Sequence, residues 1–246
     1  MDTVGDLLAR ERRSDRPALV IGDRERSYHE LITNAYKAGN VLGYHGVGGG
    51  RPLADAPVRA LAPVLAFLGA AQLGAATRFD PAAGVDAGDR MVLVPAAEQA
   101  DYDPPAGTKL AVFGGEPADP ETINWEESVW SENPAFPPTN IDPQTPLLLG
   151  GGSDNTVSHR AALSAAETVV DRYGLDADSR IVLRSSLGDP GAVVAGLLAP
   201  LTVGGVAVLA DPAASVSESR GNLAVSSGDA PEPDRIDPTS VPFSND

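Results

Sequence analysis

The sequence predicts an α/β protein in which helices are layered on a largely parallel β-sheet. Short, continuously apolar runs at residues 91–94 and 110–113 are typical of parallel strands buried on both faces. Apolar helical segments alternate with such runs along the chain, which favours strands joined by helical connections. The chain has 246 residues, of which 42% are hydrophobic, so it can bury a core without disulfides or metal.

Three helices are predicted in the first half of the chain. The first covers residues 3–13. The second begins at Ser27, because Ser27 and Glu30 have the spacing of a capping box, in which each side chain satisfies a free backbone N–H. The third, at residues 57–73, is rich in Ala and Leu and is expected to lie against a sheet. The strands expected in this half are residues 18–21, 75–79, 91–94 and 110–113.

The same alternation continues in the second half. Ser158 is placed to cap a helix that runs to about Tyr173. The uncharged segment 190–210 is as long as a membrane span, but Gly and Pro residues interrupt it. A helix at residues 192–203 followed by a strand is therefore predicted there. The strands expected in this half are residues 147–149, 180–183 and 206–209.

The domain organisation follows from shifts in composition. Residues 1–212 are expected to form the α/β domain, either as one body or as subdomains 1–114 and 145–212 joined by an acidic, Pro-rich connection at 115–144. Residues 213–246 are rich in Ser, Asp, Pro and Glu. Because so few large apolar groups cannot offset the entropy cost of ordering, a disordered acidic tail is predicted.

The charge is strongly negative. The formal net charge is −16, Arg outnumbers Lys sixteen to two, and Asp residues are scattered along the whole chain. Such a surface stays hydrated where molar salt screens charge, so an extreme halophile is the expected source. Nucleic acid and anionic membranes are excluded as partners by the same charge. The amino-terminal segment has no apolar core of a secretion signal, which predicts a cytoplasmic protein.

Few residues offer metal or nucleophilic chemistry. The absence of Cys excludes disulfides and thiolate sites, and His29, His45 and His159 lack the short spacing of metal ligands, so no metal is expected. Ser158 and His159 could belong to a hydrolase triad, but the chain has no Gly-x-Ser-x-Gly elbow. A helix cap is the favoured interpretation, and no catalytic residue is assigned.

A Gly-rich loop precedes the helix that Ser158 caps. Exposed N–H groups and the helix dipole could make it a small anion site. The alternative is a plain Gly-rich turn, which Asp154 favours because its carboxylate repels anions. The candidate cofactor-binding residues of this loop are Gly150, Gly151, Gly152, Ser153 and Thr156.

Four segments match one known family in order and spacing. Residues 15–31 and 67–81 are similar to its amino-terminal helix and strand succession, residues 158–163 to the helix after its phosphate loop, and residues 191–209 to a later helix and strand pair. The chain thus resembles the adenylate-forming acyl-CoA synthetases, the AMP-binding enzymes. The resemblance implies part of their amino-terminal domain as the fold, the Gly-rich loop as the phosphate loop, and ATP with magnesium and CoA as ligands.

The chain also departs from this family's pattern. Its loop lacks the Lys and Pro that end the family's phosphate loop, and Leu187 and Gly188 stand where the family has an aromatic residue and a His. The family's later motifs and carboxy-terminal domain would follow residue 212. We therefore expect a truncated, degenerate member without adenylation activity that acts as a scaffold or binding protein.

The alternative is a fragment of an acid-CoA ligase that a separately encoded chain completes. The sheet, expected to be incomplete near residue 210, would offer an edge to that chain or to a second copy.

Overall fold

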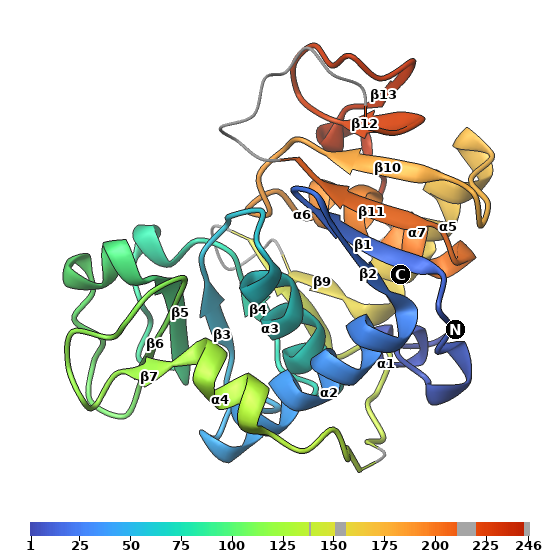
Figure 1. The fold of residues 1–246 in the computed structure, drawn as a ribbon. Coiled ribbons are helices and arrows are strands. Elements are labelled where there is room, and N and C mark those ends of the chain that lie inside the picture. Colours follow the sequence, from blue (N-terminus) through green and yellow to red (C-terminus); the bar gives the residue numbers. More distant parts are fainter. Residues whose placement is uncertain (138, 151–155, 211–219, 244–246) are drawn as a thin grey trace. The chain divides into compact units, whose positions relative to one another are not determined.

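The chain folds into two units in a computed structural model that describes residues 1–137, 139–150, 156–210 and 220–243 (Figure 1). The first unit combines residues 1–32, 58–60 and 157–246, and the second combines 33–57 and 61–156. This division differs from the expected subdomains 1–114 and 145–212. The division differs because strands far apart in the sequence pair with each other. β1 (Pro17–Ile21) lies parallel to β11 (Val206–Leu209) in one sheet, so the amino-terminal segment belongs to the same unit as the carboxy-terminal one.

The first unit is built on a six-stranded sheet with the order β13-β12-β10-β11-β1-β2. All neighbouring strands are parallel except β2, which is antiparallel to β1. Val side chains from β1, β10 and β11, together with Ala210 directly after β11, form a buried cluster on this sheet. The bounds not yet given are β2 (Arg24–Ser27), β10 (Arg180–Leu183), β12 (Leu223–Val225) and β13 (Asp234–Ile236).

The helices of the first unit are short except for α5. The helix predicted at residues 3–13 is interrupted, since α1 (Val4–Leu7) is followed by a separate 3₁₀ helix (Arg10–Arg12). Segment 190–210 forms a helix and then a strand, as predicted, and no helix in the described ranges is long and apolar enough to cross a membrane. The remaining helices are α5 (His159–Tyr173), α6 (Pro190–Val193), a π-helical segment (Val194–Leu198), α7 (Ala199–Val203) and a 3₁₀ helix (Pro238–Ser240).

The prediction of a disordered tail at residues 213–246 is wrong for residues 220–243. β12 pairs with β10, β13 pairs with β12, and Val225 and Ile236 are buried. A few apolar residues suffice here because β10 already supplies backbone partners and a core surface. The low average hydrophobicity of the whole segment conceals these short runs.

The predicted sheet edge near residue 210 is also wrong. β11 lies between β10 and β1, so it is an interior strand. The edges of this sheet are β13 and β2 instead.

The second unit contains a seven-stranded sheet with the order β7-β6-β5-β3-β4-β8-β9. The strand pairs from β7 across to β8 are parallel. The strands β3 and β7 were not predicted; β7 lies in the connection 115–144, which thus adds an edge strand to the sheet. The bounds are β3 (Leu53–Asp55), β4 (Thr77–Arg78), β5 (Met91–Pro95), β6 (Lys109–Phe113), β7 (Ile123–Asn124), β8 (Pro146–Leu149) and β9 (Thr156–Ser158).

Helices α3 (Leu61–Gln72) and α4 (Trp125–Ser131) belong to the second unit, and α2 (Tyr28–Tyr44) enters it from the first. α3 is buried along almost its whole length, as its composition predicts. Gly69 allows its close approach to α2, because a Cβ there would lie 2.7 Å from the backbone nitrogen of Gly39. The capping box at the start of α2 is confirmed: the Ser27 N–H donates to Glu30 Oε2 at 2.8 Å, and the Glu30 N–H donates to Ser27 Oγ at 3.2 Å.

Candidate functional site

The carboxyl edge of the second unit's sheet is the candidate site, because parallel α/β sheets bind ligands beyond the carboxyl ends of their strands. β3 ends there at Asp55, β4 at Arg78 and β8 at Leu149. The strand order places β3, β4 and β8 side by side. The Gly-rich loop leaves β8 at this edge, so its position in the fold is suited to a ligand.

The structure describes only the two ends of the predicted phosphate loop. Gly150 follows β8 and is half-buried, whereas Thr156 is exposed at the start of β9. Gly151, Gly152, Ser153 and also Asp154 lie outside the described residues. The loop begins from a fixed strand, because Leu148 is buried and pairs with Thr77 of β4.

Arg78 is a basic residue on β4, the strand beside β8, and it follows Thr77, which pairs with Leu148. Its guanidinium is engaged within the unit. Nη2 pairs with Asp89, and Nη1 donates to the carbonyl oxygens of Gly84 at 2.6 Å and Asp80 at 3.1 Å. The side chains of Arg78 and Asp89 are only 10% and 2% exposed, so this pair neutralises a buried charge and leaves little for an external anion.

Neither lysine of the chain stands at this edge. Lys109 begins β6, and the amino end of a parallel strand lies at the opposite edge from the end of β8. Lys37 Nζ donates to the Trp130 carbonyl oxygen on α4 at 3.3 Å, and α4 packs against β6 and β7. The edge therefore has no lysine to bind a phosphate.

Asp55 is a buried carboxylate at this edge that sequence reasoning missed. It is 0% exposed, and neither carboxylate oxygen has a hydrogen-bond partner among the residues that the structure describes. Burial raises the pKa of Asp55 well above its ordinary value. Thr77 Oγ1 on the neighbouring strand is likewise buried without a partner. The only sequence signal for Asp55 is its position at the end of the short apolar run 53–54. This signal alone does not distinguish a buried acid from an exposed one.

Ser158 caps α5, as predicted, since its Oγ accepts a hydrogen bond from the Ala161 N–H at 3.2 Å. His159 is fully buried, and its Nδ1 accepts from the Val4 N–H at 3.2 Å. Burial lowers the pKa of His159 to about 4. A neutral imidazole with Nδ1 occupied in this way is a structural contact of the first unit and does not behave as the base of a Ser-His pair.

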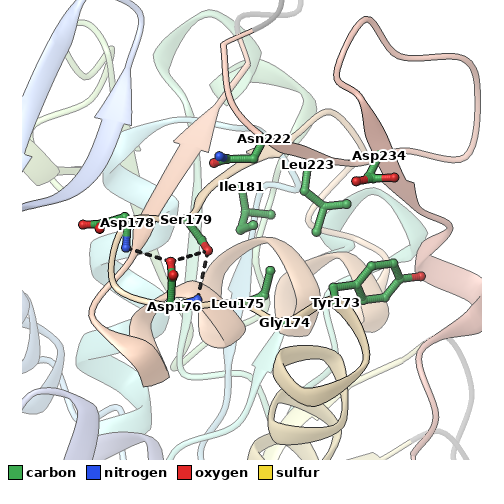
Figure 2. Close-up of a pocket in the computed structure, with 10 residues that line it drawn as sticks. All are labelled: Tyr173, Gly174, Leu175, Asp176, Asp178, Ser179, Ile181, Asn222, Leu223 and Asp234. Atoms are coloured by element: carbon green, nitrogen blue, oxygen red, sulfur yellow. Dashed lines mark hydrogen bonds between the residues drawn. The ribbon is translucent and has the colours of Figure 1, made fainter.

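The first unit has an acidic cavity of about 320 Å³ at the amino ends of β10 and β12 (Figure 2). Asp176, Asp178 and Asp234 line it, and neither Lys nor Arg does. Hydrogen bonds from Ser179 Oγ at 3.0 Å and from the Asp178 N–H at 3.0 Å hold the pKa of Asp176 below its ordinary value. Such a wall repels phosphate, and no group of three or more potential ligands within the described ranges could hold a metal ion.

Comparisons with known proteins give similarity in structure alone. No family model matches the sequence, and the comparison with curated proteins gives no match. An anthranilate CoA ligase, AuaEII, solved with anthranoyl-AMP, superposes with a TM-score of 0.75 at 18% identity over 91% of this chain and 49% of its own. A benzoate CoA ligase from Burkholderia xenovorans gives a TM-score of 0.73 at 18% identity over 90% of this chain and 49% of its own.

The N-terminal domain of FACL13 from Mycobacterium tuberculosis is also similar, with a TM-score of 0.74 at 20% identity over 92% of this chain and 63% of that one. The predicted fold is therefore confirmed: the mixed α/β architecture matches the amino-terminal domain of adenylate-forming enzymes. The chain spans about half the length of the two CoA ligases. Identities of this size show the fold, and the activity is a separate question.

Proposed function

We propose that the chain is a degenerate acyl-CoA synthetase-like protein of the AMP-binding family that does not adenylate acids and acts as a scaffold or binding protein. The single observation that carries this proposal is the loop between β8 and α5. By the sequence resemblance this loop corresponds to the family's phosphate loop, yet residues 149–157 contain no Lys and include Asp154.

The charges around this loop support the proposal. ATP carries several negative charges, and a carboxylate about 4 Å from one of them costs between about 1 kcal/mol in water and about 4 kcal/mol near a protein surface. The loop sequence includes the acidic Asp154, and Arg78 is already paired with Asp89. The residues at this edge do not fit MgATP, so we derive no catalytic step through ATP or CoA.

Isothermal titration with MgATP and with CoA, at low and at molar KCl, tests the proposal. We expect no saturable heat with MgATP. An Asp154→Lys variant restores a cation to the loop, and weak MgATP binding by this variant alone would identify the loop charge as the cause. Tight MgATP binding by the unaltered protein would refute the proposal.

The alternative proposal is that the chain is one part of an acid-CoA ligase and that a separately encoded chain supplies the rest of the enzyme. The partial coverage of the matched ligases supports it. β13 is an edge strand of the first unit's largely parallel sheet, so its unpaired backbone groups could dock a strand of that chain or of a second copy. The DNA next to the coding sequence distinguishes the two functions, because only the alternative requires a neighbouring chain with the family's remaining motifs.

We also propose that the protein works in the cytoplasm of an extreme halophile. Its 34 acidic residues support this proposal, because the buried ones among the described residues are only Asp55, Asp89 and Glu232. Screening of the remaining acidic groups by salt relieves their mutual repulsion. The melting temperature should therefore rise between 0.1 and 3 M KCl, and a fall over this range would contradict the proposal.

A further inference from the structure

A second cavity in the first unit, of about 300 Å³, has a basic wall. Arg12, Arg16, Ser14 and Tyr28 line it together with residues at the end of α7, and no carboxylate does. A volume near 300 Å³ is at the small end of ligand pockets. Two guanidinium groups around one small cavity are unusual in a chain with a net charge of −16, and they suggest a ligand of opposite charge.

Arg12 carries a positive charge that no carboxylate among the described residues pairs with. Its Nη2 donates to the carbonyl oxygens of Leu201 at 2.6 Å and Thr202 at 3.1 Å, at the carboxyl end of α7. Within the described ranges no carboxylate oxygen lies within 4.0 Å of its guanidinium nitrogens, and its buried Nε has no hydrogen-bond partner. A partly buried cation without a counter-charge is unfavourable, so an anion in the cavity would stabilise it.

Arg16 can turn toward such an anion at little cost. Its Nη2 bonds the Ala177 carbonyl oxygen and Asp178 Oδ1, the latter at 3.0 Å. The two side chains of this ion pair are 55% and 90% exposed, and exposed pairs of this kind contribute little to stability. The Ser14 hydroxyl makes no hydrogen bond within the described part of the chain, so it is a further free donor.

The other hydroxyl groups of the wall are already committed as donors. The Tyr28 hydroxyl donates to the Gly205 carbonyl oxygen at 2.7 Å, and Thr202 Oγ1 donates to the Ala199 carbonyl oxygen at 2.7 Å. Arg12 Nη1 contacts Met1 Sδ at 3.9 Å, a weak interaction that an oxyanion would replace. The donors left for a ligand are therefore this Nη1 group, the guanidinium N–H groups of Arg16 other than Nη2, and the Ser14 hydroxyl. They favour a ligand that presents only acceptors.

We propose that the cavity lined by Arg12, Ser14 and Arg16 binds a compact oxyanion, a carboxylate or phosphate group. Guanidinium groups bind both by charge-assisted hydrogen bonds, and the small volume limits the bound part to a headgroup or a small metabolite. The site lies within the first unit and does not depend on the Gly-rich loop. Failure of either proposal would therefore leave the other in place.

The test is an NMR titration of the whole chain with inorganic phosphate and, separately, with acetate. We expect saturable shifts of the backbone amides of residues 12–16 and 202–204, and the tighter of the two anions shows which group the site prefers. Arg16→Gln should weaken binding at least fivefold. Arg180→Gln is the matched control, because Arg180 also forms an exposed pair, with Glu25 at 3.1 Å, and does not line the cavity.

Two results would overturn the proposal. One is the absence of saturable shifts with both anions. The other is equal affinity in the Arg16→Gln variant and the unaltered protein. Because Arg16 is exposed, its replacement is not expected to unfold the protein, and the NMR spectrum of the variant reports this directly.

Discussion

His159 Nδ1 accepts a hydrogen bond from the backbone N–H of Val4 at 3.2 Å, and this contact joins the first turn of α5 to the start of α1. Both residues are completely buried. A protonated imidazole cannot accept a hydrogen bond at Nδ1, so the contact exists only while His159 is neutral. Burial keeps it neutral by lowering its pKa from 6.5 to about 4.

The free energy of unfolding should therefore fall as the pH drops from 6.5 toward 4. In this range the unfolded chain takes up a proton at His159 and the folded chain does not, so the stabilisation is complete above pH 6.5 and decreases below it. The difference in pKa corresponds to roughly 3 kcal/mol. Urea unfolding at a series of pH values measures it.

His159→Asn retains an acceptor near the position of Nδ1 but does not titrate in this range, so its unfolding free energy should depend less on pH. His29→Asn is the control, because His29 is exposed. An equal acid slope in His159→Asn and the unaltered protein would contradict this assignment.

Glu232 should be essential for the stability of the first unit. Its carboxylate accepts from Arg184 Nε at 2.8 Å and from Nη2 at 2.7 Å, and its side chain is 0% exposed. Although burial by itself raises the pKa of Glu232, the hydrogen bonds from Arg184 and from the Arg220 N–H hold it below the ordinary value. Glu232→Gln removes the carboxylate from this bidentate, buried ion pair and should cost about 3 kcal/mol.

Glu25→Gln provides the comparison, because Glu25 and Arg180 are 52% and 36% exposed. Its cost in the same urea titration should be below about 1 kcal/mol. Equal losses for the two substitutions would show that Glu232 does not hold residues 220–243 to β10.

Helix caps were predicted correctly because each depends only on residues that are close together in the sequence. The capping box of Ser27 and Glu30 and the cap at Ser158 involve residues only three apart, and both were correctly predicted. The pairing of β1 with β11 joins residues nearly 190 positions apart, and nothing local indicates it. β2 was missed because it contains the charged run 24–26, and such a run is typical of a strand only at a sheet edge.

Asp55→Asn should stabilise the second unit at neutral and alkaline pH. Since the pKa of Asp55 is raised in the folded protein, its contribution to stability is complete below about pH 3.8 and is lost as the pH rises through the folded pKa. An uncharged amide removes this loss and should raise the free energy of unfolding at pH 8 by about 1–3 kcal/mol. Asp101→Asn is the control, because Asp101 is exposed. Destabilisation by Asp55→Asn at pH 8 would mean that the carboxylate has a partner.

Gly191→Ala should destabilise the first unit by about 2 kcal/mol or more, because the added Cβ would lie 2.0 Å from the carbonyl oxygen of Pro238. Gly228→Ala should change stability by less than about 0.5 kcal/mol, since a Cβ there meets nothing within 4 Å. Thermal unfolding of the two variants compares them. A neutral Gly191→Ala would contradict the close approach of Pro238 to α6.

The candidate site was predictable only in part. The position of the Gly-rich loop, between a strand and a capped helix, follows from turn residues and the cap at Ser158. The pairing of Arg78 with Asp89 and the burial of Asp55 could not be predicted from the sequence. The identity of a charged residue does not show whether its side chain is buried in the fold. Whether a side chain is buried depends on which strands lie beside its own strand. These neighbours could not be predicted, because the order β5-β3-β4-β8 in the sheet differs from the order of the strands along the chain.

Acid-dependent exchange between ATP and pyrophosphate shows directly whether the chain adenylates carboxylic acids. The purified chain is assayed with benzoate, anthranilate and longer carboxylic acids in low and molar KCl, with a benzoate CoA ligase as the positive control. We predict no exchange above background, because residues 149–157 lack a phosphate-binding Lys and contain Asp154. Exchange that depends on one of these acids and disappears when it is omitted would show that the chain is an active adenylating enzyme, contrary to this prediction.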